Sequence, residues 1–140
     1  MRFMVIVKAN EKSEAGQMPS EAEMIAMGKL NAEMMAAGVM LSGDGLLPSS
    51  KGSRVKFTGS ERTVLDGPFA ETKELVAGFW VLKVKSKEEV LDWVSRIPFT
   101  EGEVEVRQIG EVEDYEPQMK TEAGRATLAA EAEVRKNGGG

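Results

Sequence analysis

Two stretches of the chain, residues 3–7 and 75–84, are apolar on both alternating faces. A strand that is apolar on both faces is typical of the covered interior of a sheet, whereas a half-solvated strand alternates between apolar and polar residues. We therefore expect central strands at residues 2–8 and 75–84. Residues 103–109 do alternate in this way, which predicts an edge or half-exposed strand.

Two helices are predicted between these strands. Ser20 precedes Glu23 by three residues, and Ser86 precedes Glu89 by the same spacing, which is the capping-box pattern at helix starts. Gly38 occupies the position expected for the end of the first helix, and Pro98 ends the second. The second helix is expected to turn inward its residues Val90, Leu91, Val94 and Ile97.

A methionine-rich stripe runs along the first predicted helix, formed by Met24, Met27, Asn31, Met34 and Met35. A helix that packs on a sheet is the simpler interpretation of this stripe, and a thioether-lined ligand wall is the alternative.

The remaining segments complete the predicted fold. We expect a strand at residues 39–41, a glycine-punctuated turn at 42–48, and a hairpin with arms at 54–57 and 63–65. The resulting order predicts an α+β chain, a ferredoxin-like split βαβ repeat with an inserted β-hairpin. Because two helices cover only one face of such a sheet, the doubly apolar strands predict a homodimer packed sheet to sheet.

The composition changes near residue 115. We expect a single domain over residues 1–115, a C-terminal helical extension over 116–136 and a disordered tail over 137–140. The extension has good helix propensity but only a weak apolar stripe, formed by Leu128 and Val134.

The composition also limits the chemistry. The chain has no cysteine and no histidine, so acid–base catalysis would depend on Asp, Glu, Lys or the single tyrosine, Tyr115. The net charge of -5 without a dense basic cluster argues against direct nucleic-acid binding. No apolar stretch approaches the roughly 20 residues that span a bilayer, and no signal peptide precedes the first strand, so we expect a cytoplasmic protein without membrane contact. No cofactor and no metal are expected, since Asp44 with Asp66 is a weak cation signal.

Residues 66–74 read DGPFAETKE, in which the Asp-Gly-Pro sequence indicates a chain reversal. These nine residues match the signature of the DGPF subgroup of YCII-related proteins, which the chain resembles from about residue 2 to 106. Further similarity lies at residues 43–48, 78–80, 93, 97–98 and 104–107.

The resemblance implies a dimeric α/β-barrel arrangement and two kinds of function. Some YCII-related proteins are taken as enzymes with a histidine–aspartate pair, including a dechlorinating branch that acts on hydroxylated aromatics. That pair is not carried over, because this chain has no histidine. DGPF proteins also resemble domains found beside extracytoplasmic-function sigma factors, which implies a role linked to transcription.

The candidate site surrounds the signature. Asp66 is interpreted either as a general base or ligand-orienting carboxylate, or as an Asx-type turn residue that accepts amides around Phe69. Lys73 is either an anion-binding group or a base whose pKa is lowered by burial, or else part of an exposed ion pair. Asp66 and Lys73 are therefore the candidate catalytic residues, and the candidate ligand-binding residues are Asp44, Arg54, Phe69, Glu71 and Arg107.

The roles of the ligand-binding candidates follow from their side chains. Arg54 and Arg107 are either carboxylate clamps or solvent-facing strand residues, and Phe69 is expected to be a hydrophobic plug. The first functional hypothesis is a protein that binds or acts on a small acidic or aromatic metabolite in a cleft near the turn. The second is a non-catalytic interaction module, linked to sigma-factor or transcription regulation, whose acidic surface meets a basic protein partner.

Overall fold

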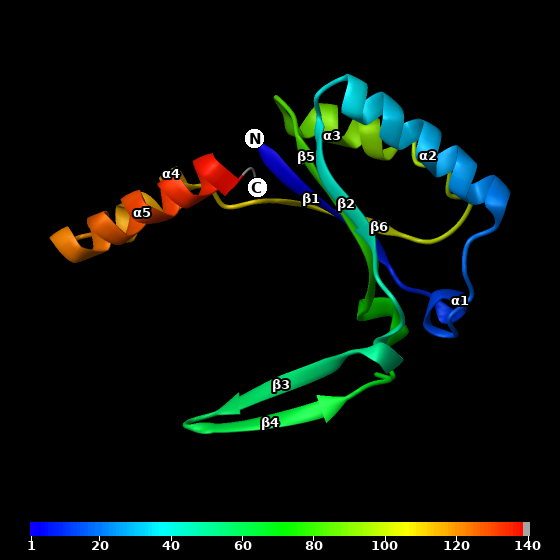
Figure 1. Ribbon diagram of the computed structural model, residues 1–140, viewed down its shortest axis with the longest axis horizontal. Coiled ribbons are helices and arrows are strands. Elements are labelled where there is room, and N and C mark those ends of the chain that lie inside the picture. The colour runs from blue at the N-terminus through cyan, green and yellow to red at the C-terminus, as the bar shows by residue number, and fades with distance from the viewer. Residues whose placement is uncertain (139–140) are drawn as a thin grey trace.

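A four-stranded antiparallel sheet forms the centre of the chain (Figure 1). The computed structural model describes residues 1–138, except for the side chain of Lys73. The sheet has the strand order β2-β5-β1-β6, with the bounds β1 (Arg2–Lys8), β2 (Met40–Gly45), β5 (Val76–Lys83) and β6 (Val104–Gln108). The helices α2 (Glu21–Ala36) and α3 (Lys87–Val94) connect β1 to β2 and β5 to β6. The predicted α+β class is confirmed, and this order is consistent with a ferredoxin-like fold.

Smaller elements surround this unit. Their bounds are α1 (Glu11–Glu14), η1 (Ser49–Lys51), β3 (Ser53–Thr58), β4 (Glu61–Asp66), η2 (Thr72–Glu74), α4 (Val112–Tyr115), η3 (Glu116–Gln118) and α5 (Glu122–Gly138). The predicted hairpin is confirmed as β3 and β4, which pair with each other in a separate two-stranded sheet. It projects from one end of the central sheet, and α4 and α5 project from the other (Figure 1).

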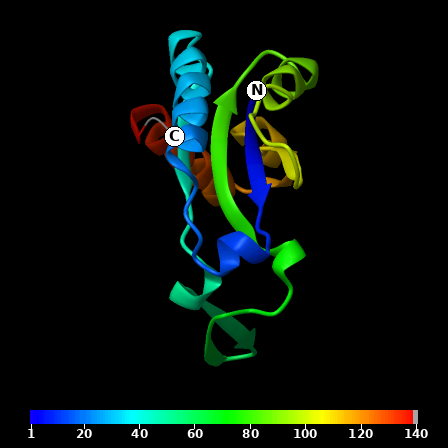
Figure 2. The same cartoon turned by 90° about the vertical axis from the view of Figure 1, so that its right-hand side faces the viewer.

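One face of the central sheet is covered by α2 and α3, which lie side by side in front of the strands in Figure 2. Phe3 and Val5 of β1 pair with Leu82 and Trp80 of β5 and point into this layer. All four side chains are buried, and Val5 is fully inaccessible to solvent. The core therefore lies between the two helices and every second residue of the central strands.

Caps fix the helix starts as expected. Ser20 accepts a hydrogen bond from the backbone N–H of Glu23, and Ser86 accepts one from that of Glu89. Gly38 follows α2 with a φ of 73°, in the left-handed region that favours glycine after a helix.

The predicted inward faces of both helices need correction. In α2, Met34 is buried and Met27 packs against the core, but Met24 and Met35 are exposed. Leu30, which the stripe did not include, is buried in their place. Leu91 of α3 is also exposed, since a residue next to a buried one lies about 100° away around the helix. The buried side of α2 is therefore narrower than the methionine spacing predicts.

The predicted turn at residues 42–48 is wrong in its first half, because β2 continues to Gly45. The glycines there allow close approach of the chain to its neighbours. A Cβ at Gly43 would lie 2.7 Å from Cδ1 of Trp80, and one at Gly78 would lie 3.1 Å from the carbonyl oxygen of Asp44. The segment between β1 and α2 includes the short helix α1.

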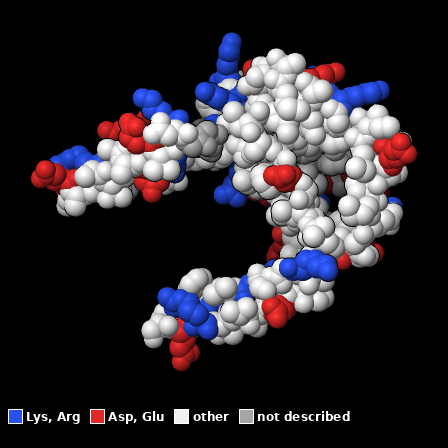
Figure 3. All heavy atoms as spheres, viewed as in Figure 1, with Lys and Arg blue, Asp and Glu red and all other residues white. Residues whose placement is uncertain are grey.

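The opposite side of the sheet has no such cover; we call it the open face. At its centre Met4 pairs with Val81 and Ile6 with Phe79, and all four side chains are partly exposed. Within residues 1–138, no helix or strand packs over this centre, and Figure 3 shows the hollow side between the two projecting arms. The hairpin, α5 and the sheet thus form three sides of a concave surface.

Within the expected C-terminal extension, residues Glu122–Gly138 form the helix α5. This helix includes the first two residues of the segment 137–140 that was expected to be a disordered tail, and residues 139–140 lie outside the described residues.

Candidate functional site

The Asp-Gly-Pro turn follows β4 and is fixed by the segment around Ser49. The backbone N–H of Gly67 donates to the carbonyl oxygen of Gly52 at 3.0 Å, and the Gly67–Pro68 peptide bond is cis. A Cβ at Gly67 would overlap the carbonyl oxygen and carbon of Ser49. Gly67 has no positive φ, so close backbone approach is what requires glycine here.

Ser49 also holds the residues on either side of the turn. Its hydroxyl accepts a hydrogen bond from the backbone N–H of Phe69 at 3.0 Å and donates one to Glu14. Asp66 instead accepts a hydrogen bond from the hydroxyl of Ser53 at 2.7 Å. The Asx-turn interpretation is therefore wrong for the amide of Phe69, because Ser49 binds it. Sequence reasoning missed Ser49 and Glu14, which lie far from the signature in the chain.

Phe69 and Arg54 form a stacked pair beside the turn. The guanidinium carbon of Arg54 lies 3.9 Å from the centroid of the Phe69 ring, a favourable cation–π geometry. Phe69 is half-buried and Arg54 is exposed. The expected hydrophobic plug is thus a partly exposed ring with a cation on its face.

Two carboxyl groups lie together at the end of the signature. A hydrogen bond that protonated Glu74 donates to the Glu71 carboxylate, and then the negative charge of Glu71, raise the pKa of Glu74 above its ordinary value. The positive charges of Lys8 and Arg54 act in the opposite direction and lower the pKa of Glu74, so both cations lie near this carboxyl. We call Lys8, Arg54, Phe69, Glu71 and Glu74 the turn cluster.

Arg107 reaches the turn cluster only through other residues. It donates a hydrogen bond to Glu105 at 3.2 Å, and Lys8 forms an ion pair with the same carboxylate at 3.2 Å. Hydrogen bonds from Arg107 and then Lys8 lower the pKa of Glu105. Lys8, Glu74 and Glu105 were not predicted as site residues. Glu74 is the last residue of the signature, which could have indicated it, but nothing in the local sequence of Lys8 or Glu105 separates them from other charged strand residues.

The remaining candidates are spread over the structure. Asp44 lies on β2 and Arg107 on β6, the opposite edges of the sheet, so three strand spacings of about 5 Å separate them. The side chain of Lys73 lies outside the described residues, so its role stays a prediction. Among residues 1–138, no cluster of three or more metal-ligating side chains occurs.

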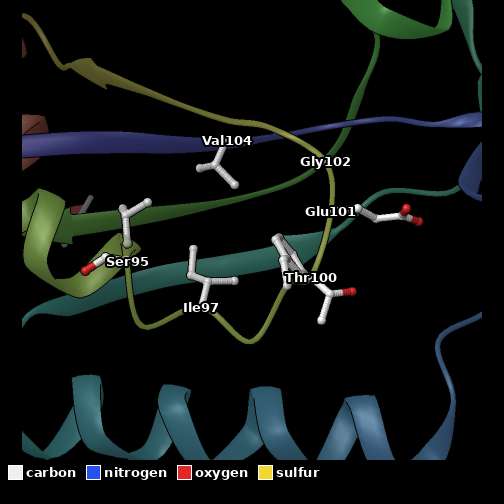
Figure 4. A pocket seen from close by; sticks show the side chains of 8 residues that line it. Ser95, Ile97, Thr100, Glu101, Gly102 and Val104 are labelled. Atoms are coloured by element: carbon white, nitrogen blue, oxygen red, sulfur yellow. The ribbon is translucent and has the colours of Figure 1, made fainter.

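Two hollows of the surface lie away from the turn cluster. One, of about 300 Å³, lies between the end of α3 and the loop that leads into β6 (Figure 4). Ile97, Phe99 and Val104 supply apolar walls, and Ser95, Thr100 and Glu101 supply polar atoms. The other, of about 660 Å³, lies beside α5. Neither is lined by a turn-cluster residue, so the turn cluster is a separate, exposed surface.

The structure thus defines an α+β protein with one uncovered sheet face and a charged turn at the base of that face. Its sequence matches the profile of the YCII-related domain over residues 1–113, so the chain belongs to the YCII-related domain family. No helix within the described part of the chain is long and apolar enough to cross a membrane.

Two known proteins are similar to this chain. An uncharacterized protein of Rhizobium meliloti (strain 1021) is 36% identical over 67 residues, which are 46% of this chain and 54% of that protein. The chain thus matches about half the length of this relative. A solved structure, the 5-chloro-2-hydroxyhydroquinone dehydrochlorinase of Burkholderia phenoliruptrix in complex with 2,5-dihydroxybenzoquinone, is 16% identical with a TM-score of 0.48. The alignment covers 79% of this chain and 95% of that structure.

Proposed function

We propose that this protein binds a small acidic or aromatic metabolite at the turn cluster. The observation that carries the proposal is the Arg54–Phe69 stack, at 3.9 Å, beside the Glu71–Glu74 pair. One surface thereby presents a cation, an aromatic face and a carboxyl group that retains its proton to higher pH.

Each part of the turn cluster suits a different part of such a ligand. The guanidinium of Arg54 matches a carboxylate or phenolate oxygen through paired N–H donors. The ring of Phe69 offers a stacking surface to an aromatic body. The pKa of Glu74 is raised by its contact with Glu71, so Glu74 is a better acid–base candidate than Asp66, which accepts a hydrogen bond from Ser53. Asp66 and Lys73 remain proposed as orienting and anion-binding groups.

Binding is tested by thermal shift and NMR titration against a panel of hydroxylated benzoates and small dicarboxylic acids. Arg54→Ala is expected to weaken a ligand about tenfold, because a charge-assisted contact contributes about 1.5–3 kcal/mol. Arg62→Ala is the matched control: Arg62 lies on the same hairpin over Phe57, at 4.6 Å, outside the turn cluster. A ligand whose affinity responds equally to both variants would remove the turn cluster from the site.

Turnover is tested separately with Glu74→Gln. If the protein is an enzyme, this variant should retain ligand affinity and lose product formation, because the amide cannot transfer the proton. Ligand binding without any product in the wild type would define a binding protein instead.

We also propose that a second copy of the chain covers the open face, in a sheet-to-sheet homodimer. Support comes from the apolar centre of that face and from the two arms that stand on either side of it (Figure 1). A stable interface of this kind buries on the order of 2,000 Å² or more. Val81→Glu should give monomers in analytical ultracentrifugation, and a wild-type monomer at micromolar concentration would refute the dimer.

A second candidate function is a protein-interaction module linked to transcription regulation. It is favoured by the exposed apolar side of the hairpin, where Val55 pairs with Val64 and Phe57 is 68% exposed. A stoichiometric partner that binds the wild type and is lost with Phe57→Ala would support this function. A small ligand that requires Arg54, in the absence of such a partner, would favour the first.

A further inference from the structure

The larger hollow lies where the C-terminal extension meets the upper end of the sheet. It has a volume of about 660 Å³, and residues of β1, β2, β5, α4 and α5 line it. In Figure 1 the last turns of α5 lie beside the start of β1. The volume falls in the range of about 300–1,000 Å³ that small-molecule sites occupy.

The charge of this hollow is opposite to that of the whole protein. The chain carries a net charge of -5, yet the lining holds four Lys or Arg residues and two Glu residues. Arg2 is neutralised by a bidentate contact with Glu111, at 2.7 and 3.3 Å. Among the described residues, Lys83 and Lys136 make no ion pair. Arg135 and Glu113 of the lining also make no ion pair there, so three unpaired cations and one unpaired carboxylate face this space.

The hollow is also held in shape by contacts at its rim. Arg135 donates a hydrogen bond to the carbonyl oxygen of Gly110 at 3.3 Å, which joins α5 to the segment after β6. The Arg2–Glu111 contact joins the start of α4 to β1. Together these contacts link α5 to residues 110–111 and these residues to β1, and neither contact uses Lys83 or Lys136.

Apolar side chains form the rest of the lining. Leu41 is 39% exposed although it is a large apolar residue on β2, and Val112 and Ala132 are partly buried beside it. An apolar surface next to free cations is complementary to a molecule with an anionic head and an apolar body.

We propose that this hollow binds a small amphipathic carboxylate, with its head group at Lys83 and Lys136 and its body against Leu41, Val112 and Ala132. Ala132, Arg135 and Lys136 lie beyond residue 113, where the match to the family domain ends. The site is therefore built jointly by the family domain and the extension. It is separate from the turn cluster and independent of the function proposed there.

The test uses octanoate as the probe and 1-octanol as its uncharged counterpart, in calorimetric titration of the full chain. Octanoate is expected to bind at low salt and 1-octanol at least about tenfold more weakly, because it lacks the charge. Lys83→Ala and Lys136→Ala should each weaken octanoate about fivefold, and higher salt should weaken it further. Lys87→Ala, a change of an exposed lysine on α3 that does not line the hollow, should have no effect. Arg54→Ala should also leave octanoate binding unchanged, which separates this site from the turn cluster.

Steric filling provides a second, independent variant. Ala132→Trp should abolish octanoate binding, whereas Ala129→Trp, at an exposed position of the same helix outside the lining, should not. The lysine variants keep the test decisive if Ala132→Trp fails to fold, since both lysines are surface residues. Equal binding of octanoate and 1-octanol, no binding of octanoate, or binding that survives loss of both lysines would each overturn the proposal.

Discussion

The two faces of the central sheet both carry apolar side chains at their centres, but these side chains are buried on one face and partly exposed on the other. On the helix-covered face, Val5 and Leu82 are buried and belong to one continuous core. On the open face, their strand neighbours Met4 and Val81 are only partly buried. The difference shows that apolarity of a strand indicates what must be covered but not what covers it. Charged groups also collect at the edges of the open face, where Lys8, Glu105 and Arg107 interact.

The largest expected effect tests the covered face. Leu82→Ala should lower the free energy of unfolding by about 2–5 kcal/mol, because it leaves a cavity in a close-packed core. Leu41→Ala is the matched control on β2, and with 39% of that side chain exposed we expect a loss of about 1 kcal/mol or less. Urea denaturation measures both, and equal losses would contradict the contrast between the two environments.

The next effect concerns the turn at the base of the open face. Gly67→Ala should lower the free energy of unfolding by about 1–3 kcal/mol, because the new methyl group overlaps the backbone of Ser49, which has little freedom to move. Gly45→Ala, where a Cβ meets nothing within 4 Å, should change stability by less than about 0.5 kcal/mol. Thermal denaturation of both variants compares them, and a neutral Gly67→Ala would show that the turn is not held against Ser49.

A smaller effect is expected at the exposed stack. Phe69→Ala should lower stability by about 1–2 kcal/mol, because the ring is only half-buried and the cation–π contact with Arg54 is worth about 0.5–1 kcal/mol. Phe57→Ala provides the comparison, since its ring is 68% exposed under Arg62 and should cost less than Phe69→Ala. A loss of about 3–5 kcal/mol at Phe69 would instead indicate a fully buried ring.

The smallest effect is electrostatic and is best measured by NMR titration of the carboxyl carbons. Glu71→Gln should lower the pKa of Glu74 toward its ordinary value, because the negative charge beside it disappears. Arg107→Ala should raise the pKa of Glu105, because a hydrogen bond to its carboxylate is lost. Each variant should leave the other carboxyl unchanged.

The two carboxyl groups also have opposite effects on stability as the pH changes. The pKa of Glu74 is raised by folding, so its contribution is present below its unfolded pKa and is lost as the pH rises through the folded value. The pKa of Glu105 is lowered, so its contribution is present above the unfolded pKa and is lost as the pH falls through the folded value. Opposite changes in the pH dependence of Glu71→Gln and Arg107→Ala would confirm these signs.

The order of the main helices and strands, the helix starts at Ser20 and Ser86, the hairpin and the family were all predictable from the sequence. These features are local, because caps, alternation and turn residues act over a few neighbouring positions. The same reasoning placed Met24, Met35 and Leu91 inward, because spacing alone does not fix which 100° of a helix surface faces the sheet. The glycines of β2 suggest a turn in the sequence. In the structure they instead allow β2 to approach Trp80 and β5 closely, and this contact with a distant strand has no local signal.

The composition of the site depends on the three-dimensional fold. It paired Phe69 with Arg54 and Ser49, and brought Lys8 beside Glu74 and Glu105, groups that lie far apart in the chain. It also brought α5 against the start of β1 to form the larger hollow. Such contacts depend on how the hairpin and the extension are placed against the sheet. Contacts between side chains that are distant in the chain leave no periodic signal in the sequence.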